Sequence, residues 1–211
     1  EFSPLNGSLQ FNGKLDNIKL SKVELRNESF LFSGSSHLKN IFDSDFEITS
    51  NINSLYFSRN GISQALKLLP KANILEKIKN LGDLNLSGSV MLNSENLTSN
   101  LSCLSEKGNI ITSINADLKT VKNNLFFDQL ESNLKLENFD IGDFIEGFGE
   151  VNGSLNVSAS GPISNIDLIK LKGYFNNIKY FSKTYSDIKS FTRKTSNGYE
   201  NRLTINDRDI K

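Results

Sequence analysis

Side chains capable of catalytic chemistry are scarce in this chain. Its 211 residues include one histidine, His37, and one cysteine, Cys103. A catalytic thiol needs a base within hydrogen-bond reach, and His37, in a turn-like Ser-Ser-His-Leu context, offers it no evident partnership. We therefore expect His37 to lie at the surface. Cys103 shares the parity of its apolar neighbours, so we expect it to be a buried thiol.

Paired carboxylates are the second kind of candidate. Asp43 with Asp45, and Asp207 with Asp209, could act as the acid and base of glycoside hydrolysis. Both pairs flank predicted strands, and solvated strand ends are the plainer interpretation. One cysteine and one histidine cannot form a Cys/His metal cluster, and Asp207-Arg-Asp is too short for a calcium loop. The sequence thus predicts no catalytic residues, no metal site, no cofactor and no enzyme activity.

The charge balance excludes strongly charged partners. Lys plus Arg and Asp plus Glu each number 24, so the net charge is zero, and no strong field would attract nucleic acid or an anionic membrane. No run of about 18 apolar residues could span a bilayer as a helix. The chain opens without a start Met, and we expect it to be an excised piece of a longer protein.

Elsewhere the dominant signal is an apolar residue at every second position. This period-two alternation is typical of half-buried strands and recurs from Leu9 to Ile205. A change of parity near Ser21-Lys22 predicts a bulge or turn. Gly34-Ser-Ser predicts a turn, and Asn197-Gly198 predicts a hairpin turn.

Between residues 61 and 81 the apolar spacing changes to three and four, which indicates helix. Asn60-Gly61 is expected to form a turn before it, with Ser63 as a possible cap. Pro70 should break or kink the segment, which gives two short helices or one bent one. The segment is amphipathic and basic, so a membrane-surface helix is an alternative, but a helix covering one end of the sheet is preferred.

Three segments resemble one another, and they start 75 and 71 residues apart. They are Gly7-Ser-Leu-Gln-Phe-Asn-Gly13, Gly82-Asp-Leu-Asn-Leu-Ser-Gly88 and Gly153-Ser-Leu-Asn-Val-Ser-Ala159. A repeat of this length would hold several strands. We divide the chain into a first β repeat (1–60), a helical insert (61–81), a second β repeat (82–148) with a short helical turn near 142–148, and a truncated third β repeat (149–211).

These segments resemble the repetitive region of the TamB/AsmA-like envelope proteins. That family has runs of short strands, then a helix, then a Gly-x-Leu-x-apolar-x-Gly strand, as in residues 62–92 here and again in 138–155. The resemblance implies an all-β fold: an elongated, strongly curved, repetitive sheet, a β-taco or open jelly-roll-like groove, with one or two short helices at the repeat junction. Pro70 and the long first repeat depart from a regular pattern.

The resemblance also implies a function and a location. It predicts a non-catalytic periplasmic module of a protein anchored in the inner membrane. Its apolar groove would carry phospholipid between the inner and outer membranes, or assist outer-membrane protein assembly. The implied partners are phospholipid acyl chains and an outer-membrane β-barrel of the BamA/TamA type, with no nucleic acid.

The candidate groove residues share the alternating apolar parity. They are Leu9, Phe11, Leu15, Phe46, Ile48, Leu84, Leu86, Val90, Leu92, Leu101, Ile110, Ile114, Leu118, Leu125, Phe127, Leu134, Leu136, Leu155, Val157, Ile169, Leu171 and Phe175. In a strand such residues line one side. Two alternatives stay open: an extracellular adhesin or glycan-binding β-solenoid, and a structural spacer whose apolar face is covered by packing.

Overall fold

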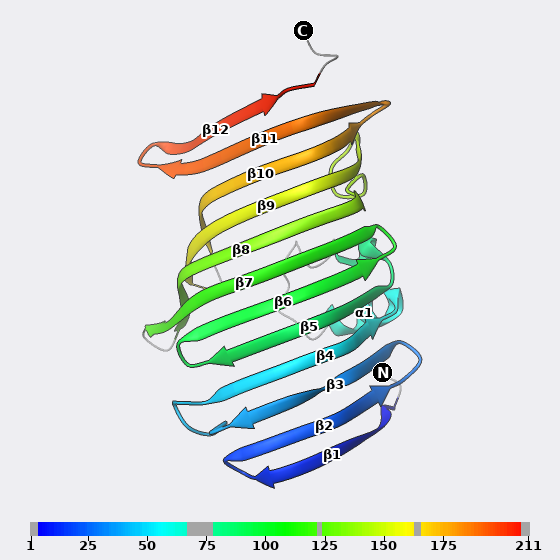
Figure 1. The fold of residues 1–211 in the computed structure, drawn as a ribbon, viewed down its shortest axis with the longest axis vertical. Helices are drawn as coiled ribbons and strands as arrows, with labels where there is room; N and C mark the ends of the chain where they lie inside the picture. Colours follow the sequence, from blue (N-terminus) through cyan, green and yellow to red (C-terminus); the bar gives the residue numbers. More distant parts are fainter. Residues whose placement is uncertain (1–3, 67–77, 122–123, 163–165, 208–211) are drawn as a thin grey trace. The chain divides into compact units, whose positions relative to one another are not determined.

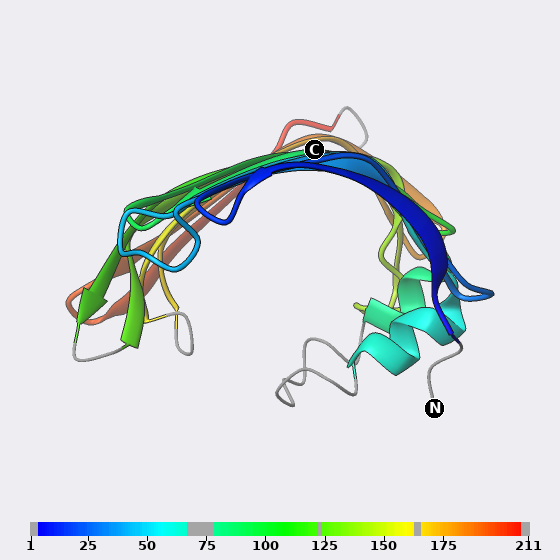
Figure 2. The same ribbon diagram turned by 90° about the horizontal axis from the view of Figure 1, so that it is seen from below.

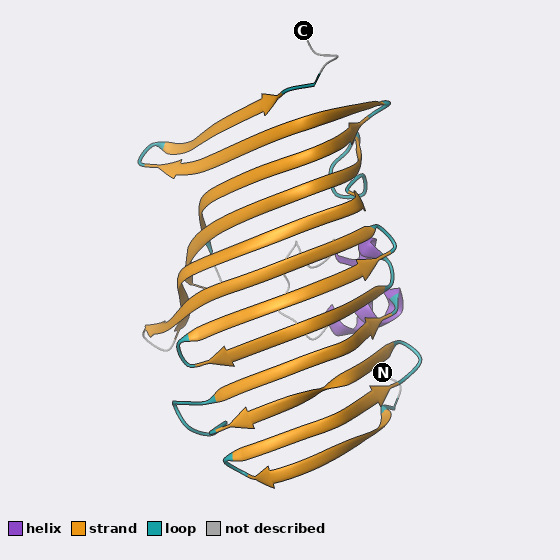
Figure 3. Ribbon diagram, viewed as in Figure 1, coloured by secondary structure: helices purple, strands orange, loops and turns teal. Residues whose placement is uncertain are grey.

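The computed structural model describes residues 4–66, 78–121, 124–162 and 166–207, and nearly all of their regular structure is β-strand (Figures 1 and 3). The strands are β1 (Asn6–Lys14), β2 (Asn17–Arg26), β3 (Phe30–Lys39), β4 (Glu47–Phe57), β5 (Leu84–Asn93), β6 (Asn96–Ser105), β7 (Gly108–Val121), β8 (Asn124–Asp140), β9 (Phe148–Pro162), β10 (Asp167–Tyr180), β11 (Lys183–Thr195) and β12 (Gly198–Ile205). An α-helix, α1 (Arg59–Leu66), and a 3₁₀ turn, η1 (Lys79–Leu81), stand between β4 and β5.

The twelve strands form one sheet in which the spatial order follows the chain order from β1 to β12. Consecutive strands from β1 to β5 and from β7 to β12 pair in the antiparallel sense, which suits the short connections between most of them. The expected all-β class is therefore confirmed.

Two compact units share this sheet. The first contains Glu1–Asn93 with Leu101–Lys107, and the second contains Ser94–Asn100 with Gly108–Lys211. The two parts of β6 thus belong to different units. Each unit is described below by itself.

Some of the predicted bulges and turns are present in the structure, and others are not. The register shifts between Leu20 and Val23, and Lys22 has a φ of 50°, so the expected bulge is confirmed. The hairpin at Asn197-Gly198 is also confirmed, since Gly198 has a φ of 126°. The turn expected at Gly34 is wrong: Gly34 lies inside β3, opposite Val23 and beside a second register shift.

The predicted helical insert begins earlier than expected. Asn60 and Gly61 lie inside α1, and the cap is Ser58, whose Oγ accepts a hydrogen bond from the Gly61 amide at 3.2 Å. Ser63 instead donates its hydroxyl hydrogen to the Arg59 carbonyl. Pro70 lies outside the described residues.

A second helical turn was expected near 142–148, and a single turn is present there. The amides of Phe144 and Ile145 both donate to the Ile141 carbonyl at 2.9 Å. The chain then returns to the sheet at Phe148, the first residue of β9. This loop, residues 141–147, thus connects β8 to β9 as the α1 segment connects β4 to β5.

Strand β1 bends along its length, and α1 lies on the side toward which it bends (Figure 2). Ile62 of α1 is 4% exposed, so the helix buries at least one apolar side chain. Within the described ranges, no helix has the length and apolar character needed to cross a membrane.

A core substitution should test which side chains hold the sheet together. Val151 of β9 is 1% exposed and lies between Phe139 of β8 and Ile178 of β10. We expect Val151→Ala to lower the free energy of unfolding by about 2 kcal/mol, because two buried methyl groups are lost and a cavity remains. Ile111 of β7, 38% exposed, is the control, and Ile111→Ala should cost less than about 1 kcal/mol. Urea unfolding followed by circular dichroism measures both, and equal losses would contradict the assignment.

Candidate functional site

In the first unit the strand register gathers apolar side chains on one face of the sheet. Residues directly opposite one another in paired strands point to the same side, and β3 contributes every second residue from Phe30 to Leu38. The rows, read from β1 or β2 or β3 toward β5, are Phe11/Leu20/Ser36/Ser50/Val90, Gly13/Ile18/Leu38/Ile48/Leu92, Val23/Gly34/Ile52/Gly88, Leu25/Phe32/Leu55/Leu86 and Phe30/Phe57/Leu84. We call this surface the apolar face of the first unit.

The second unit has an apolar face of its own. Here β9 contributes every second residue from Val151 to Ala159. The rows, read from β7 or β8 toward β12, are Leu118/Phe127/Gly161, Ala116/Leu130/Ala159/Leu168, Ile114/Ser132/Val157/Leu171/Thr192/Asn201, Thr112/Leu134/Leu155/Gly173/Ser190/Leu203, Ile110/Leu136/Gly153/Phe175/Ile188/Ile205 and Phe139/Val151/Ile178/Tyr185. The opposite side of each unit is its polar face.

Exposure differs sharply between the two faces of the second unit. On the apolar face, Ala116 and Val151 are 1% exposed and Ala159 is 3% exposed. On the polar face, Ile111 is 38% exposed and Tyr174 is 47% exposed. Neighbouring side chains therefore crowd the apolar face much more than the polar face.

No second sheet covers this surface in the part of the second unit that the structure describes. Every described element there is a strand of the one sheet. Most apolar side chains of the face, Leu134 and Leu155 among them, consequently stay half-buried. The apolar face is therefore available to a ligand that can complete its burial.

Most of the predicted groove residues lie on these faces. They are Phe11, Ile48, Leu84, Leu86, Val90 and Leu92 in the first unit, and Ile110, Ile114, Leu118, Phe127, Leu134, Leu136, Leu155, Val157, Leu171 and Phe175 in the second. Leu125 pairs with Thr120 through the backbone, but its side chain lies outside the described ones.

The other predicted groove residues lie outside these rows. Leu9 stands at a register shift in β1, and Ile169 stands at one in β10, where Leu168 takes the place opposite Ala159. Leu15 lies in the turn after β1 and is 74% exposed. Phe46 directly precedes β4, and Leu101 lies in β6.

The groove candidates omitted many residues of the apolar faces, and some of these omissions follow bulges that change the parity. The missed ones include Ile18, Leu20, Val23, Leu25, Phe30, Phe32, Leu38, Ile52, Leu55, Phe57, Ala116, Leu130, Phe139, Val151, Ala159, Leu168, Ile178 and Ile188. The parity change near Lys22 was a usable signal for Val23 and Leu25. In general, counting from the nearest bulge would have found more of them.

The titratable candidates are not brought together. His37 Nε2 lies 2.7 Å from the Asn17 side-chain oxygen, on the polar face. Cys103 is partly buried, and desolvation raises the pKa of its thiol, which favours the unreactive thiol form. Asp45 accepts a hydrogen bond from Asn40, and Asp209 lies outside the described residues. Among the described residues, no group of three or more His, Cys, Asp or Glu side chains could hold a metal ion.

The polar face carries charge pairs across neighbouring strands. Lys39 lies 2.9 Å from Glu47, and hydrogen bonding to Lys39 lowers the Glu47 pKa. Glu200 contacts Arg193 and Arg202, each at 2.6 Å, and its pKa is lowered chiefly by the hydrogen bond from Arg193. These groups are solvated, so each pair contributes little to stability.

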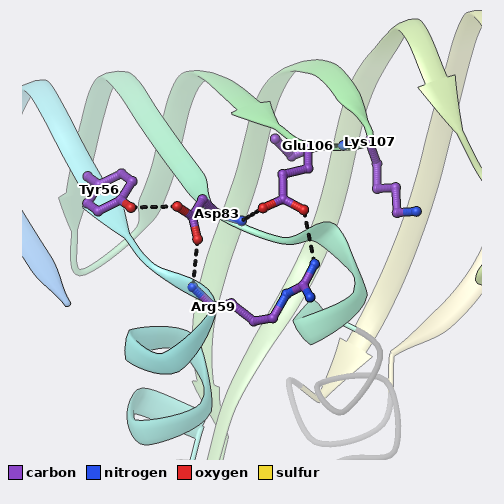
Figure 4. A network of polar contacts seen from close by, with 6 residues as sticks. Tyr56, Arg59, Asp83, Glu106 and Lys107 are labelled. Carbon is purple, nitrogen blue, oxygen red and sulfur yellow. Dashed lines mark hydrogen bonds and ion pairs between the residues drawn. The ribbon is translucent and has the colours of Figure 1, made fainter.

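A polar network fastens α1 to the strands of the first unit (Figure 4). Asp83 accepts a hydrogen bond from the Tyr56 hydroxyl at 2.6 Å and from the Arg59 backbone amide at 2.9 Å. The Arg59 guanidinium lies 3.0 Å from Glu106, whose other carboxylate oxygen accepts the Asp83 amide at 3.4 Å. Asp83 thus satisfies an orphan amide at the start of α1 and places negative charge there.

The hydrogen bonds of this network set the protonation of its members. The Tyr56 hydroxyl holds the pKa of Asp83 below its ordinary value of 3.8, and the Arg59 amide adds to this. The same bond raises the pKa of Tyr56. The network holds a helix in place, and it does not pair a nucleophile with a general base.

We expect Asp83→Ala to loosen α1, because the first helical amide loses its acceptor. Hydrogen exchange of the α1 amides should become faster, while Asp117→Ala in β7 should leave it unchanged. Since the folded pKa of Asp83 is depressed, its contribution is complete above pH 3.8 and is lost as the pH falls further. Exchange that is unaltered in Asp83→Ala would show that the network does not hold the helix.

No family model matches this sequence, and no curated protein or solved structure is significantly similar to it. The likeness to TamB/AsmA-like repeats is therefore one of sequence pattern. What the molecule offers for function is the pair of apolar faces described above.

Proposed function

We propose that the apolar faces bind phospholipid acyl chains, and that the chain is a non-catalytic module of a TamB/AsmA-like cell-envelope protein. The observation that carries this proposal is an apolar sheet face that no second layer covers among the described residues of the second unit. Rows of apolar side chains that stay half-buried form a surface that an apolar ligand could cover.

The energetics favour such a ligand. Each buried methylene gains roughly 0.8 kcal/mol, so a tail of about 15 carbons gains on the order of 10 kcal/mol before ordering costs. The gain is smaller here to the extent that neighbouring side chains already shield the face. No base, nucleophile or metal is needed for this kind of binding.

Polar groups on the apolar faces are hydrogen-bonded to one another. Ser36 and Ser50 lie opposite each other with their hydroxyl oxygens 2.8 Å apart, and Thr192 donates to Asn201 at 2.8 Å. Such pairing lowers the cost of removing these groups from water, so they offer a passing acyl chain few polar obstacles. Binding would then be unselective, and a tail could slide because successive contacts are equivalent.

The chain order of the similar segments supports the repeat. Gly7–Gly13 lies in β1, Gly82–Gly88 leads into β5, and Gly153–Ala159 lies in β9. The segments therefore recur every four strands, and an interruption stands before the second and before the third. The envelope-protein resemblance implies a repeat of this kind. It also implies a strongly curved groove, a periplasmic location and an outer-membrane β-barrel of the BamA/TamA type as partner.

A glycan-binding role has one observation in its favour. A hollow of about 560 Å³ lies on the polar face of the second unit, lined by Asn133, Asn156, Lys172 and the exposed Tyr174 among others. Amide side chains beside an exposed aromatic ring could hold a sugar. This reading and the lipid proposal place their ligands on opposite faces, so mapping the ligand separates them.

Photo-cross-linking should decide between the faces. We expect a phosphatidylcholine with a diazirine in its acyl chain to label apolar-face residues around Leu134 and Leu155, as mapped by peptide mass spectrometry. Leu134→Ser with Leu155→Ser should reduce the labelling about tenfold, since two apolar contacts are lost. Ile111→Ser, on the polar face, is the matched control and should retain it.

Circular dichroism of each variant confirms that the strands persist. Labels confined to the polar face would favour the glycan interpretation. A chain that takes up no label at all would be a structural spacer, and the lipid proposal would fail.

A further inference from the structure

Exposed apolar side chains lie at one set of strand ends in the second unit. Loop 141–147 and the two-residue turn between β10 and β11 lie at these ends (Figure 1). Phe181 is 67% exposed, Ile145 is 51% exposed and Tyr180 is 40% exposed. We call these three residues the aromatic tip.

The tip is held by specific contacts. The Phe181 amide donates to the Gly147 carbonyl at 2.6 Å, which ties the turn to the loop. The ring of Tyr180 packs 4.7 Å from that of Phe181 and 4.9 Å from that of Phe148. A Cβ on Gly147 would come within 3.0 Å of the Phe181 ring, and its φ of 83° also requires glycine. Loop and turn therefore present one continuous surface.

Phe181 is an unusual residue for its position. It has a φ of 50° at the first place of a two-residue hairpin turn, where glycine, asparagine or aspartate is usual. A bulky side chain in this conformation is strained, and the exposed ring gains little burial in return. A ligand that buries the ring would supply the free energy of burial that offsets this strain.

The tip also continues the apolar face. Phe148 and Tyr180 are cross-strand partners next to the row that contains Val151 and Ile178. The apolar surface thus reaches the strand ends and emerges there as exposed rings. An acyl chain leaving a bilayer would meet these rings first and the half-buried rows next.

The charges around the tip identify the kind of surface it suits. Lys179 and Lys183 flank the turn, Asp143 and Glu146 lie in the loop, and Asp140 directly precedes it, so the local formal charge is close to zero and is not positive. A phenol ring with apolar neighbours suits the boundary between headgroups and acyl chains. This local charge favours zwitterionic lipids over anionic ones.

We propose that the aromatic tip inserts into the surface of a zwitterionic phospholipid bilayer and is where acyl chains enter the apolar face of the second unit. The entry role rests on the proposed function. The membrane contact itself does not depend on it.

The chain contains no tryptophan, so Phe181→Trp places a single fluorescent reporter at the tip. Its emission should shift to shorter wavelength on addition of phosphatidylcholine vesicles. The shift should persist in high salt, because insertion is apolar and not electrostatic. An unchanged spectrum, or a shift abolished by salt, would overturn the proposal.

Vesicle co-flotation of variants gives the second measurement. Phe181→Asn relieves the backbone strain, because asparagine tolerates this conformation, so the variant should fold at least as well as the parent. Combined with Ile145→Ser it should reduce vesicle binding by about tenfold or more. Phe42→Asn is the matched control, since Phe42 is an exposed phenylalanine in another loop, 79% exposed. Equal losses in the two variants would contradict a specific tip.

The two proposals fail in different ways. If Phe181→Asn with Ile145→Ser abolishes vesicle binding but monomeric diazirine lysophospholipid still labels the apolar face, both stand. If vesicle binding is unaffected while labelling of the apolar face persists, the tip is refuted and the acyl-chain site remains. If the tip binds vesicles and no apolar-face residue is labelled, the entry role and the proposed function fail together.

Discussion

One layer of strands must shield its own apolar side, and this constraint governs the rest of the structure. In the first unit, Phe11 of β1 is 56% exposed, whereas Val23 of the neighbouring β2 is 6% exposed. In the second unit, Leu203 of β12 is 67% exposed and Ile188 of β11 is 5% exposed. Shielding is therefore greater where strands stand on both sides, because cross-strand neighbours then cover a side chain from two directions. A single sheet meets this need by adding strands.

The polar chemistry of the chain is consistent with such a surface. Charges pair locally across the polar face, as Lys39 does with Glu47, and the whole chain is formally neutral. Among the described buried side chains, no polar atom lacks a hydrogen-bond partner.

The sequence predicted the class of fold well because alternation is a local signal. Strands, the bulge at Lys22 and the hairpin at Gly198 all follow from neighbouring residues. Gly34 could not be placed in this way. Gly-Ser-Ser is typical of a turn, yet here a Cβ on Gly34 would come within 2.4 Å of the Asn51 carbonyl oxygen. Its glycine permits a close approach between the paired strands β3 and β4.

The sequence predicted that an apolar face exists, but it did not predict all of the residues that form it. Ile169 has the right parity in its own strand, but a register shift against β9 gives the place on the apolar face to Leu168. Register depends on the partner strand, which a single sequence does not name. Ser58 was missed as the helix cap for a related reason: the start of α1 is fixed partly by Asp83, from the strand that follows the insert.

The two junctions show where a sheet of alternating strands can acquire distinct properties. After β4 and after β8 the chain leaves the sheet, and it returns past a left-handed glycine, Gly82 with a φ of 76° or Gly147 with a φ of 83°. Each glycine leaves room for a side chain from a later turn. At Gly82 this is the Glu106 carboxylate, within 2.3 Å of an added Cβ, and at Gly147 it is the Phe181 ring.

A glycine with a positive φ therefore supports the polar network of Arg59 and Glu106 at one junction and the aromatic tip at the other. The strands between the junctions must keep their alternation, since any loss of apolar side chains would expose the face they shield together. The junctions are under no such restriction, because their side chains lie at the strand ends. Variation in a sheet of this kind should therefore concentrate at the junctions.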